Sequence, residues 1–338
     1  MKTIAAIVAL AATALACVMG SASAQETTLI FATTDPPQAH LNQRVLHPWA
    51  ARINKKGKGI VRIDVRDGPT IANHVNFYQR VLDDVVQIAW GLPAYVAGKF
   101  PRTGVAELPG VADNAEYASV ALWRIYKSGA LDAEYNEIVP LFMNVFPQNG
   151  IHLAKAPKSI ESLSGLKIGA GSRITTEIVS HLGGSPISIP LTSYYESVQR
   201  GTIDGTISQW TQFQPFKLGE VTFYHIDAKL GGASGIVFMA RKKFDSLPAE
   251  VRKIIMSESG EAQSRLYGKF WDTVNAEERA KIKAQPDKHT IVTLSPEQEK
   301  KWDARVKPVT DEWVKNTPGG QKILGTFEAE IAKVKAGH

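Results

Sequence analysis

Cysteine is almost absent from this sequence, which has 338 residues and a single cysteine, Cys17. No disulfide can therefore form within the chain, and a zinc site built from cysteine ligands is excluded. The composition is otherwise that of a globular protein, with 44% hydrophobic, 21% charged and 8% aromatic residues, which excludes disordered, collagen-like and coiled-coil proteins. A chain of this length can bury a sizeable core, and its size favours two lobes over one.

The motifs of common hydrolases are also missing. The sequence contains neither the HExxH pattern of zinc proteases nor the GxSxG turn of serine hydrolases. Its eight histidines are scattered, so a zinc-binding receptor would need several of them to converge in space. Asp83 and Asp84 are adjacent, so their side chains point in different directions and fit a helix end better than an acid–base pair. We therefore expect a protein without enzyme activity, metal or cofactor. The alternative is that the protein is a periplasmic hydrolase.

Long apolar runs are confined to the first segment of the chain. Lys2 precedes the apolar residues 4–16, and Ala22-Ser23-Ala24 has the small residues that signal peptidase recognises. We predict a secretory signal at residues 1–24, cleaved after Ala24, with a lipid anchor at Cys17 as the alternative. No later stretch reaches the about 20 apolar residues of a membrane helix. The prediction is a monomeric, soluble protein of the periplasm that does not itself span a membrane.

The excess of basic residues is small. The net charge is +6, and removal of Lys2 with the signal leaves 6 − 1 = +5. The lysines are scattered apart from two short clusters, Lys55-Lys56-Gly57-Lys58 and Arg241-Lys242-Lys243. Nucleic acid is not expected as a partner of an exported protein, and a solvated surface explains this pattern, although a mildly basic surface can also gather anionic ligands.

Strands and helices alternate along the sequence. We predict strands at 28–32, 60–65 and 85–90 with helices at 41–53 and 73–83, then strands at 166–168, 187–189 and 205–208 with helices at 174–182 and 194–200. Two such sets predict an α/β protein with two lobes of similar design. A strand at 234–240 is expected to run back between the lobes, a long helical stretch covers 248–282, and a charged helical region follows Pro296.

The segment Gly169-Ala170-Gly171-Ser172-Arg173 follows a predicted strand and opens a predicted helix. Free backbone N–H groups at a helix start can hold an anion, and Ser172 is a natural helix N-cap. A basic residue at the positive end of a helix is locally unfavourable by ~0.3–1 kcal/mol, which makes sense if an anion lies between them. Arg173 is therefore our candidate for a carboxylate anchor, because a guanidinium can donate two parallel hydrogen bonds. The alternative is a surface arginine.

Aromatic residues follow strands in both predicted lobes. Trp90 ends one strand and Tyr95 follows it, while Trp210 and Phe213 follow the strand that ends at Ser208-Gln209. Ligands bind at the carboxyl ends of strands in open α/β sheets. These side chains can therefore sandwich a flat or apolar ligand, and the alternative for each is a place in the core.

These motifs together resemble the substrate-binding proteins of TRAP transporters, the tripartite ATP-independent periplasmic systems for organic acids. The segments that carry the resemblance are Leu163-Ser164-Gly165-Leu166-Lys167-Ile168, Leu182-Gly183-Gly184-Ser185-Pro186, Ser197–Gly205, Ala106-Glu107-Leu108-Pro109 and Met239–Pro248. The resemblance implies a two-lobe periplasmic binding protein fold, type II-like, with crossing strands and a long helix that spans both lobes. It places lobe I at 25–149 plus about 238–277, and lobe II at 150–237 plus about 278–338.

The resemblance also implies closure around a carboxylate and delivery of the ligand, without ATP, to a small and a large membrane subunit. A receptor for an ABC importer or a sensor kinase is the alternative, because its binding chemistry would be the same. The family usually has an arginine where this chain has Gly169, and a second one where it has His152. Arg173 is the candidate substitute for the first, and His152 either contacts the ligand or is structural.

Other positions align with the family's pocket. They are Leu92, Tyr95, Leu191 and Ser208, beside the strand-end residues Trp90, Gln209, Trp210 and Phe213 and the helix cap Ser172. Leu92 and Tyr95 stand where binders of sugar acids often have polar residues. The resemblance therefore implies a pocket for an aromatic or otherwise hydrophobic monocarboxylate rather than a sugar acid or a short dicarboxylate.

Overall fold

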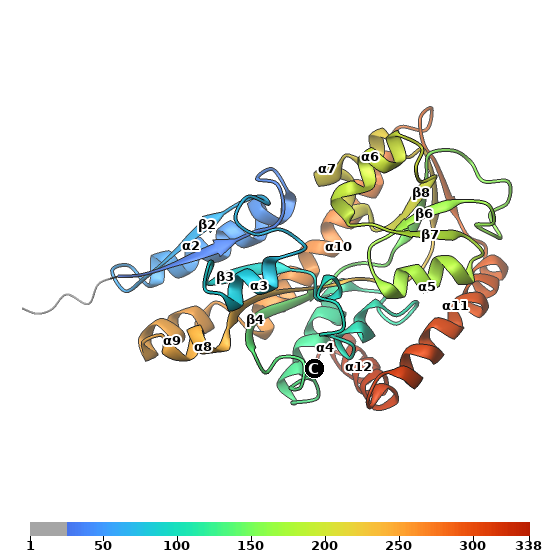
Figure 1. Ribbon diagram of the computed structural model, residues 1–338. Coiled ribbons are helices and arrows are strands. Elements are labelled where there is room, and N and C mark those ends of the chain that lie inside the picture. The colour runs from blue at the N-terminus through green and yellow to red at the C-terminus, as the bar shows by residue number, and fades with distance from the viewer. Residues whose placement is uncertain (1–25) are drawn as a thin grey trace, which may run out of the picture.

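The computed structural model describes residues 26–338, so the predicted signal segment and Cys17 lie outside the described residues. The chain forms two α/β lobes, each built on its own sheet, with the helix α10 running between them (Figure 1). The predicted two-lobe fold is confirmed. The boundaries assigned to the two lobes along the sequence stay a prediction.

The first lobe is built on a five-stranded sheet in the order β2-β1-β3-β10-β4. Its strands are β1 (Thr27–Ala32), β2 (Val61–Arg66), β3 (Ile88–Gly91), β4 (Ile138–Val145) and β10 (Ser234–Ala240). The first three are parallel, and β10 runs antiparallel to both of its neighbours, β3 and β4. Every residue of β4 and β10 is buried, because helices cover both faces of the sheet where these apolar strands lie.

The second lobe is built on a six-stranded sheet in the order β11-β9-β5-β8-β6-β7. Its strands are β5 (Gly150–Leu153), β6 (Lys167–Ala170), β7 (Ser185–Ser188), β8 (Gly205–Ser208), β9 (Tyr224–Asp227) and β11 (Thr290–Thr293). Strands β7, β6 and β8 are parallel, and β5 runs antiparallel to β8 and β9. The carboxyl ends of β6 and β8 therefore meet at one edge of the sheet, which faces the first lobe.

Helices surround the two sheets. They are α2 (His47–Lys56), α3 (Phe77–Leu82), α4 (Ala115–Lys127), α5 (Arg173–His181), α6 (Tyr194–Gln199), α7 (Phe213–Phe216), α8 (Arg241–Ser246), α9 (Ala249–Ser257), α10 (Glu261–Lys283), α11 (Pro296–Asn316) and α12 (Gly320–Lys335). Helix α11 packs against α5 and α12 against α4. Short turns of 3₁₀ helix matter for the site: η2 (Pro93–Tyr95), η3 (Thr103–Glu107), η4 (Leu191–Ser193) and η5 (Trp210–Gln212).

Helix α10 is the long helix expected to contact both lobes. Near its C-terminal end, Glu277 pairs with Arg44 of the first lobe at 2.7 Å, and Arg279 pairs with Asp227 of the second at 2.6 Å. The continuous helix expected at 248–282 is interrupted, because Gly260 has φ +82° and separates α9 from α10. This left-handed conformation is easily adopted only by glycine.

Two chain segments cross between the lobes side by side, at 146–150 and 228–234. The backbone N–H of Asn149 donates to the Gly231 carbonyl at 2.7 Å, and the Asn149 amide nitrogen donates to the same oxygen at 2.7 Å. The Gly231 N–H in turn donates to the Gln148 side chain at 2.7 Å. These bonds hold the crossing segments together. Hinge motions of two-lobe proteins take place in such linking segments, so we name these two segments the hinge.

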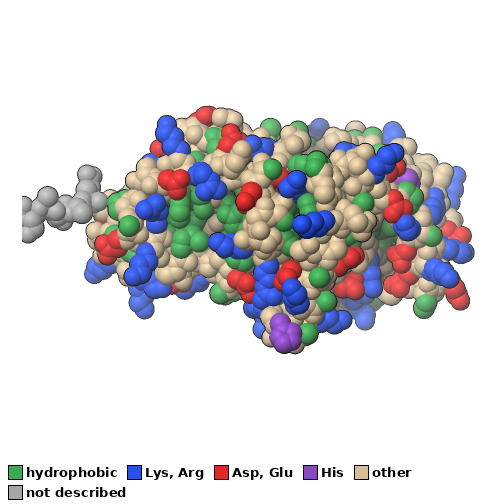
Figure 2. Space-filling view, turned by 90° about the horizontal axis from the view of Figure 1, so that it is seen from below, with side chains coloured by type: hydrophobic (Ala, Val, Ile, Leu, Met, Phe, Trp, Pro, Cys, Tyr) green, Lys and Arg blue, Asp and Glu red, His purple; other side chains and the backbone are tan. Residues whose placement is uncertain are grey.

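Basic and acidic side chains are interspersed on the face shown in Figure 2, with no large area of one sign. This mixture fits the scattered lysines and the small net charge of +6. Within residues 26–338, no helix combines the length and the apolar composition needed to cross a bilayer.

Candidate ligand-binding site

Two adjoining hollows lie between the lobes, and we name them by position. The cleft pocket is lined by residues that include Leu92, Tyr95, Leu191 and Gln209, and the outer pocket by residues that include Arg173 and Trp313. They hold ≈ 420 Å³ and ≈ 720 Å³ of empty space, part of it open to solvent. The pockets meet at Ala94, Glu107 and Ser172, which line both.

Tyr95 enters the cleft pocket from the first lobe. Strand β3 ends at Gly91, and the turn η2 that follows carries Tyr95 toward the second lobe. There its hydroxyl oxygen accepts a hydrogen bond from the backbone N–H of Leu191 at 3.3 Å. Burial raises the pKa of Tyr95 to about 12, so the hydroxyl stays neutral and keeps a proton to donate.

Ser172 enters from the second lobe, where β6 ends and α5 begins. Its hydroxyl accepts from the Thr175 N–H at 3.2 Å, and the Thr175 hydroxyl accepts from the Ser172 N–H at 3.0 Å. The predicted N-cap is confirmed as part of a reciprocal capping box. A Cβ atom on Gly171 would lie 3.0 Å from the Tyr95 hydroxyl and 3.4 Å from that of Tyr194. The glycine therefore lets two phenol hydroxyls approach the backbone just before the helix.

The position where the family usually has its first arginine is filled by other side chains. A Cβ atom on Gly169 would lie 2.9 Å from Ile203 and 3.2 Å from the ring of Tyr194. Tyr194 is buried, and burial raises its pKa well above the usual range, with Tyr95 adding to the shift. A neutral phenol therefore stands beside Gly169.

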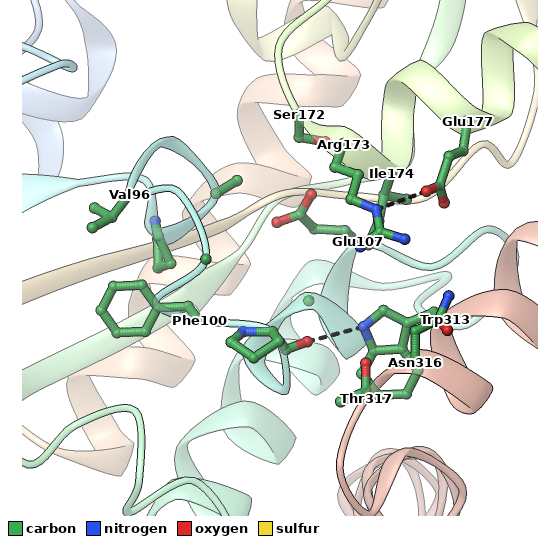
Figure 3. A pocket seen from close by; sticks show the side chains of 15 residues that line it. Val96, Phe100, Glu107, Ser172, Arg173, Ile174, Glu177, Trp313, Asn316 and Thr317 are labelled. Atoms are coloured by element: carbon green, nitrogen blue, oxygen red, sulfur yellow. Dashed lines mark hydrogen bonds and ion pairs between the residues drawn. The ribbon is translucent and has the colours of Figure 1, made fainter.

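Arg173 lines the outer pocket and not the cleft pocket. Its Nε donates to Glu177, one turn along α5, at 2.7 Å (Figure 3), and its side chain is 71% exposed. Only its two terminal nitrogens remain for a ligand. The anchor role of Arg173 stays a prediction, and the structure places it at the mouth of the site beside Ser172.

Several predicted site residues lie behind the pockets. Trp210 and Phe213 pack on the ring of His152, with centroids 4.6 and 4.8 Å away, and the three side chains, like Ser208 and Trp90, line neither hollow. Trp90 is buried in the first lobe against His74, with ring centroids 5.7 Å apart. Contact of these residues with a ligand stays a prediction.

His152 begins a chain of three buried histidines. Its Nε2 lies 3.0 Å from the Ser208 carbonyl, which can only accept, so this nitrogen carries the proton. In the neutral ring Nδ1 then accepts from Nδ1 of His225 at 3.1 Å, and Nε2 of His225 accepts from Nδ1 of His289 at 3.1 Å. Burial lowers the pKa of His152 to about 4. Burial, with repulsion from the two flanking histidines, lowers that of His225 to about 2.

Glu107 was not among the predicted site residues. It ends η3, is 4% exposed and lines both pockets, and Figure 3 shows it in the outer pocket. Burial raises the pKa of its carboxyl to about 7, and a hydrogen bond from Ser172 acts in the opposite direction. The signal in the sequence was a lone acid in the apolar run Gly104-Val105-Ala106-Glu107-Leu108-Pro109. Within residues 26–338, no group of three or more His, Cys, Asp or Glu side chains is arranged so that it could hold a metal ion.

Two lobes joined by a hinge, with a small-molecule pocket at the carboxyl ends of strands from both, define a receptor that closes around a solute. The chain belongs to the DctP family, described as bacterial extracellular solute-binding protein, family 7, which matches residues 31–316. The predicted family is therefore confirmed, and its members are receptors rather than enzymes.

Individual relatives match over nearly the whole chain. The outer membrane transporter protein TsaT of Comamonas testosteroni is 26% identical over 92% of this chain and 94% of its own. A TRAP solute-binding protein from Rhodoferax ferrireducens T118, crystallised with copurified benzoate, is 28% identical with a TM-score of 0.85, covering 92% of this chain and 100% of that one. A marine metagenome TRAP protein specific for aromatic acids, with bound metahydroxyphenylacetate, is 25% identical with a TM-score of 0.84, covering 91% and 99%.

Proposed function

We propose that this protein is a periplasmic receptor that binds an aromatic monocarboxylate and delivers it, chemically unchanged, to TRAP membrane subunits. The observation that carries the proposal is the lining of the cleft pocket, which combines the apolar Leu92 and Leu191 with hydrogen-bonding groups such as Tyr95, Ser172 and Gln209. An apolar cavity with a few convergent polar groups suits a flat apolar body with one polar end. The two solved relatives with bound aromatic acids support this ligand class.

The orientation of the ligand follows from where the polar groups lie. We place the ring in the cleft pocket, between Leu92 of the first lobe and Leu191 of the second. We place the carboxylate where the two pockets meet, beside Ser172, accepting hydrogen bonds from the terminal nitrogens of Arg173. Closure about the hinge then buries the ring and removes water, because the ligand contacts both lobes only in the closed form.

The ligand class is tested by a thermal-shift screen followed by titration calorimetry. Benzoate and hydroxybenzoates should raise the melting temperature, because a ligand that binds only the folded chain stabilises it by RT ln(1 + [L]/Kd). Succinate and sugar acids at equal concentration should raise it much less. A receptor that prefers the dicarboxylate or the sugar acid would contradict the proposal. Mass spectrometry of the recovered ligand should show the mass that was added, and a changed mass would indicate an enzyme.

The role of Arg173 is tested by Arg173→Ala beside Arg200→Ala. Arg200 is a matched control, because it also pairs with a glutamate four residues away and its side chain is 73% exposed, while it lines neither pocket. If Arg173 is an anchor, Arg173→Ala should lower the benzoate affinity tenfold or more, which corresponds to about 1.4 kcal/mol. Arg200→Ala should bind benzoate with the affinity of the natural protein. An affinity of Arg173→Ala within about twofold of the control would show that Arg173 is not an anchor.

A further inference from the structure

A buried acid lies at the point where the proposed ligand places its negative charge. Glu107 is 4% exposed and borders both pockets, next to Ser172 (Figure 3). Among residues 26–338 it forms no ion pair, and the Ser172 hydroxyl is the one side-chain group that lowers its pKa by hydrogen bonding. An unpaired carboxylate in such a place is costly, because burial disfavours its charged form.

The groups around Glu107 do not supply a compensating positive charge. From α5 it faces Arg173 and Glu177, which pair with each other, and from η2 and α6 it faces the neutral phenols of Tyr95 and Tyr194. The part of α11 that borders the outer pocket contributes Trp313, Asn316 and Thr317, which carry no charge.

The remaining elements packed against η3 also leave Glu107 without a cation. Strand β10 has no titratable side chain. Of the charged side chains on α4 and α12, Arg124 pairs with Glu330 and Glu261, and Glu116 pairs with Arg265. Lys322 of α12 lines a separate hollow together with Arg102, and Glu107 does not line that hollow. Asp35 and His74 lie beyond Tyr95, where they approach each other to 3.5 Å.

An organic anion and an ionised Glu107 therefore cannot share this site at low cost. Two carboxylates in one site raise the affinity of the pair for a proton, and they bind one between them. Burial, opposed by the Ser172 hydrogen bond, already raises the pKa of Glu107 to about 7, and a neighbouring anion shifts it further upward.

We infer that the receptor takes up its organic anion together with one proton, which Glu107 holds in the complex. The proton comes from solvent, and no covalent bond to carbon forms or breaks. One carboxyl oxygen of Glu107 accepts from Ser172, and the other, protonated, donates to the ligand carboxylate. This inference rests on the proposed function and adds the residue that makes an anion acceptable in a cleft with so little positive charge.

The test is benzoate affinity by calorimetry at pH 6 and pH 8. Benzoate stays ionised in this range, since carboxyl groups lose their proton near pH 4. Affinity of the natural protein should fall about tenfold or more from pH 6 to pH 8, because complex formation then includes proton uptake. In Glu107→Gln the side-chain amide donates the hydrogen bond in place of the protonated acid. The benzoate affinity of this variant should therefore change less than about twofold between pH 6 and pH 8. Glu177→Gln, in the outer pocket, is the matched control and should keep the pH dependence of the natural protein.

A second measurement counts the protons directly. The binding heat at pH 7 in two buffers of different ionisation enthalpy should report an uptake of about half to one proton per benzoate, and none in Glu107→Gln. Tight binding of equal strength at pH 6 and pH 8, without proton uptake, overturns the role of Glu107 and leaves the proposed function standing. The same role is overturned if Glu107→Gln keeps the pH dependence. No binding of aromatic acids by either protein at either pH overturns both proposals.

Discussion

Replacing His225 with glutamine should make the protein less sensitive to acid. His225 is the middle member of the buried chain His152–His225–His289. Burial, repulsion from His152 and repulsion from His289 lower its pKa to about 2 in the folded chain, whereas an unfolded histidine has a pKa of about 6.5. As the pH falls below 6.5, the unfolded chain gains a proton on this ring that the folded chain does not, so the folded state loses stability.

The size of the effect follows from the shift. Each unit of pKa difference corresponds to about 1.4 kcal/mol, and between pH 7 and pH 5 the unfolded ring becomes almost fully protonated, which costs the folded state about 2 kcal/mol. His225→Gln removes this loss. The variant should therefore gain about 2 kcal/mol relative to the natural protein when both are moved from pH 7 to pH 5. His152→Gln should give a similar gain, because burial lowers the pKa of His152 to about 4.

The assay is urea unfolding without ligand, followed by tryptophan fluorescence at both pH values. His338→Gln is the control, because it removes an exposed histidine at the C-terminus and leaves the core unchanged. Groups that titrate elsewhere, Glu107 among them, cancel when each variant is compared with the natural protein. Equal losses of unfolding free energy in His225→Gln and the natural protein would refute the account of the buried histidines.

Three further outcomes follow from the structure, each measured by urea unfolding. Glu107→Gln should be more stable than the natural protein at pH 7, and this difference should shrink by about 2 kcal/mol at pH 5. The reason is that the raised pKa of Glu107 destabilises the folded natural protein as the pH rises from about 4.5 to 7. A difference in stability that is the same at both pH values would contradict this. Gly231→Ala should cost more than about 2 kcal/mol, since φ is +78° and a Cβ would overlap the Glu107 carbonyl, whereas Gly201→Ala, at φ +69° in open space, should cost about 1 kcal/mol; equal losses would argue against the overlap. Gly169→Arg should lose about 1–3 kcal/mol through overpacking against Tyr194 without tighter benzoate binding, and an increase in affinity would show that an anchor can be restored there.

Local patterns in the sequence predicted seven strands, which are β1, β2, β3, β6, β7, β8 and the antiparallel β10, and they missed the parallel strand β11. The strand at 205–208 and the cap at Ser172 were placed correctly, because apolar runs and N-cap residues act over a few neighbours. The strands β4, β5 and β9 were not predicted. They pair antiparallel across long stretches of sequence, as between Ile151 and Ile226, and such pairing leaves little local signal.

The site was predicted in part for the same reason. Strand ends and the alignment indicated Leu92, Tyr95, Leu191, Gln209 and Ser172, which do line the cleft pocket. Whether these residues contact a ligand stays a prediction. The surroundings of Glu107 could not be foreseen, since they come from η2, α5, α6 and α11, which are far apart in the chain.

Two predicted site residues, His152 and Arg173, contact partners that the sequence analysis did not name. His152 turns toward His225, 73 residues away, and no local pattern could indicate that partner. Arg173 turns toward Glu177, and this contact was readable from the spacing of four residues, since opposite charges at that spacing attract on a helix.

The position of β10 has a consequence for how the chain is made. This strand fills the gap between β3 and β4, yet it follows all five strands β5–β9 in the sequence. Until Ala240 has emerged, the edges of β3 and β4 have no partner, and exposed edges of this kind readily pair with other chains. Neither lobe can therefore be finished before the other has begun, and a protein cut at residue 230 should yield two fragments that fold only when mixed.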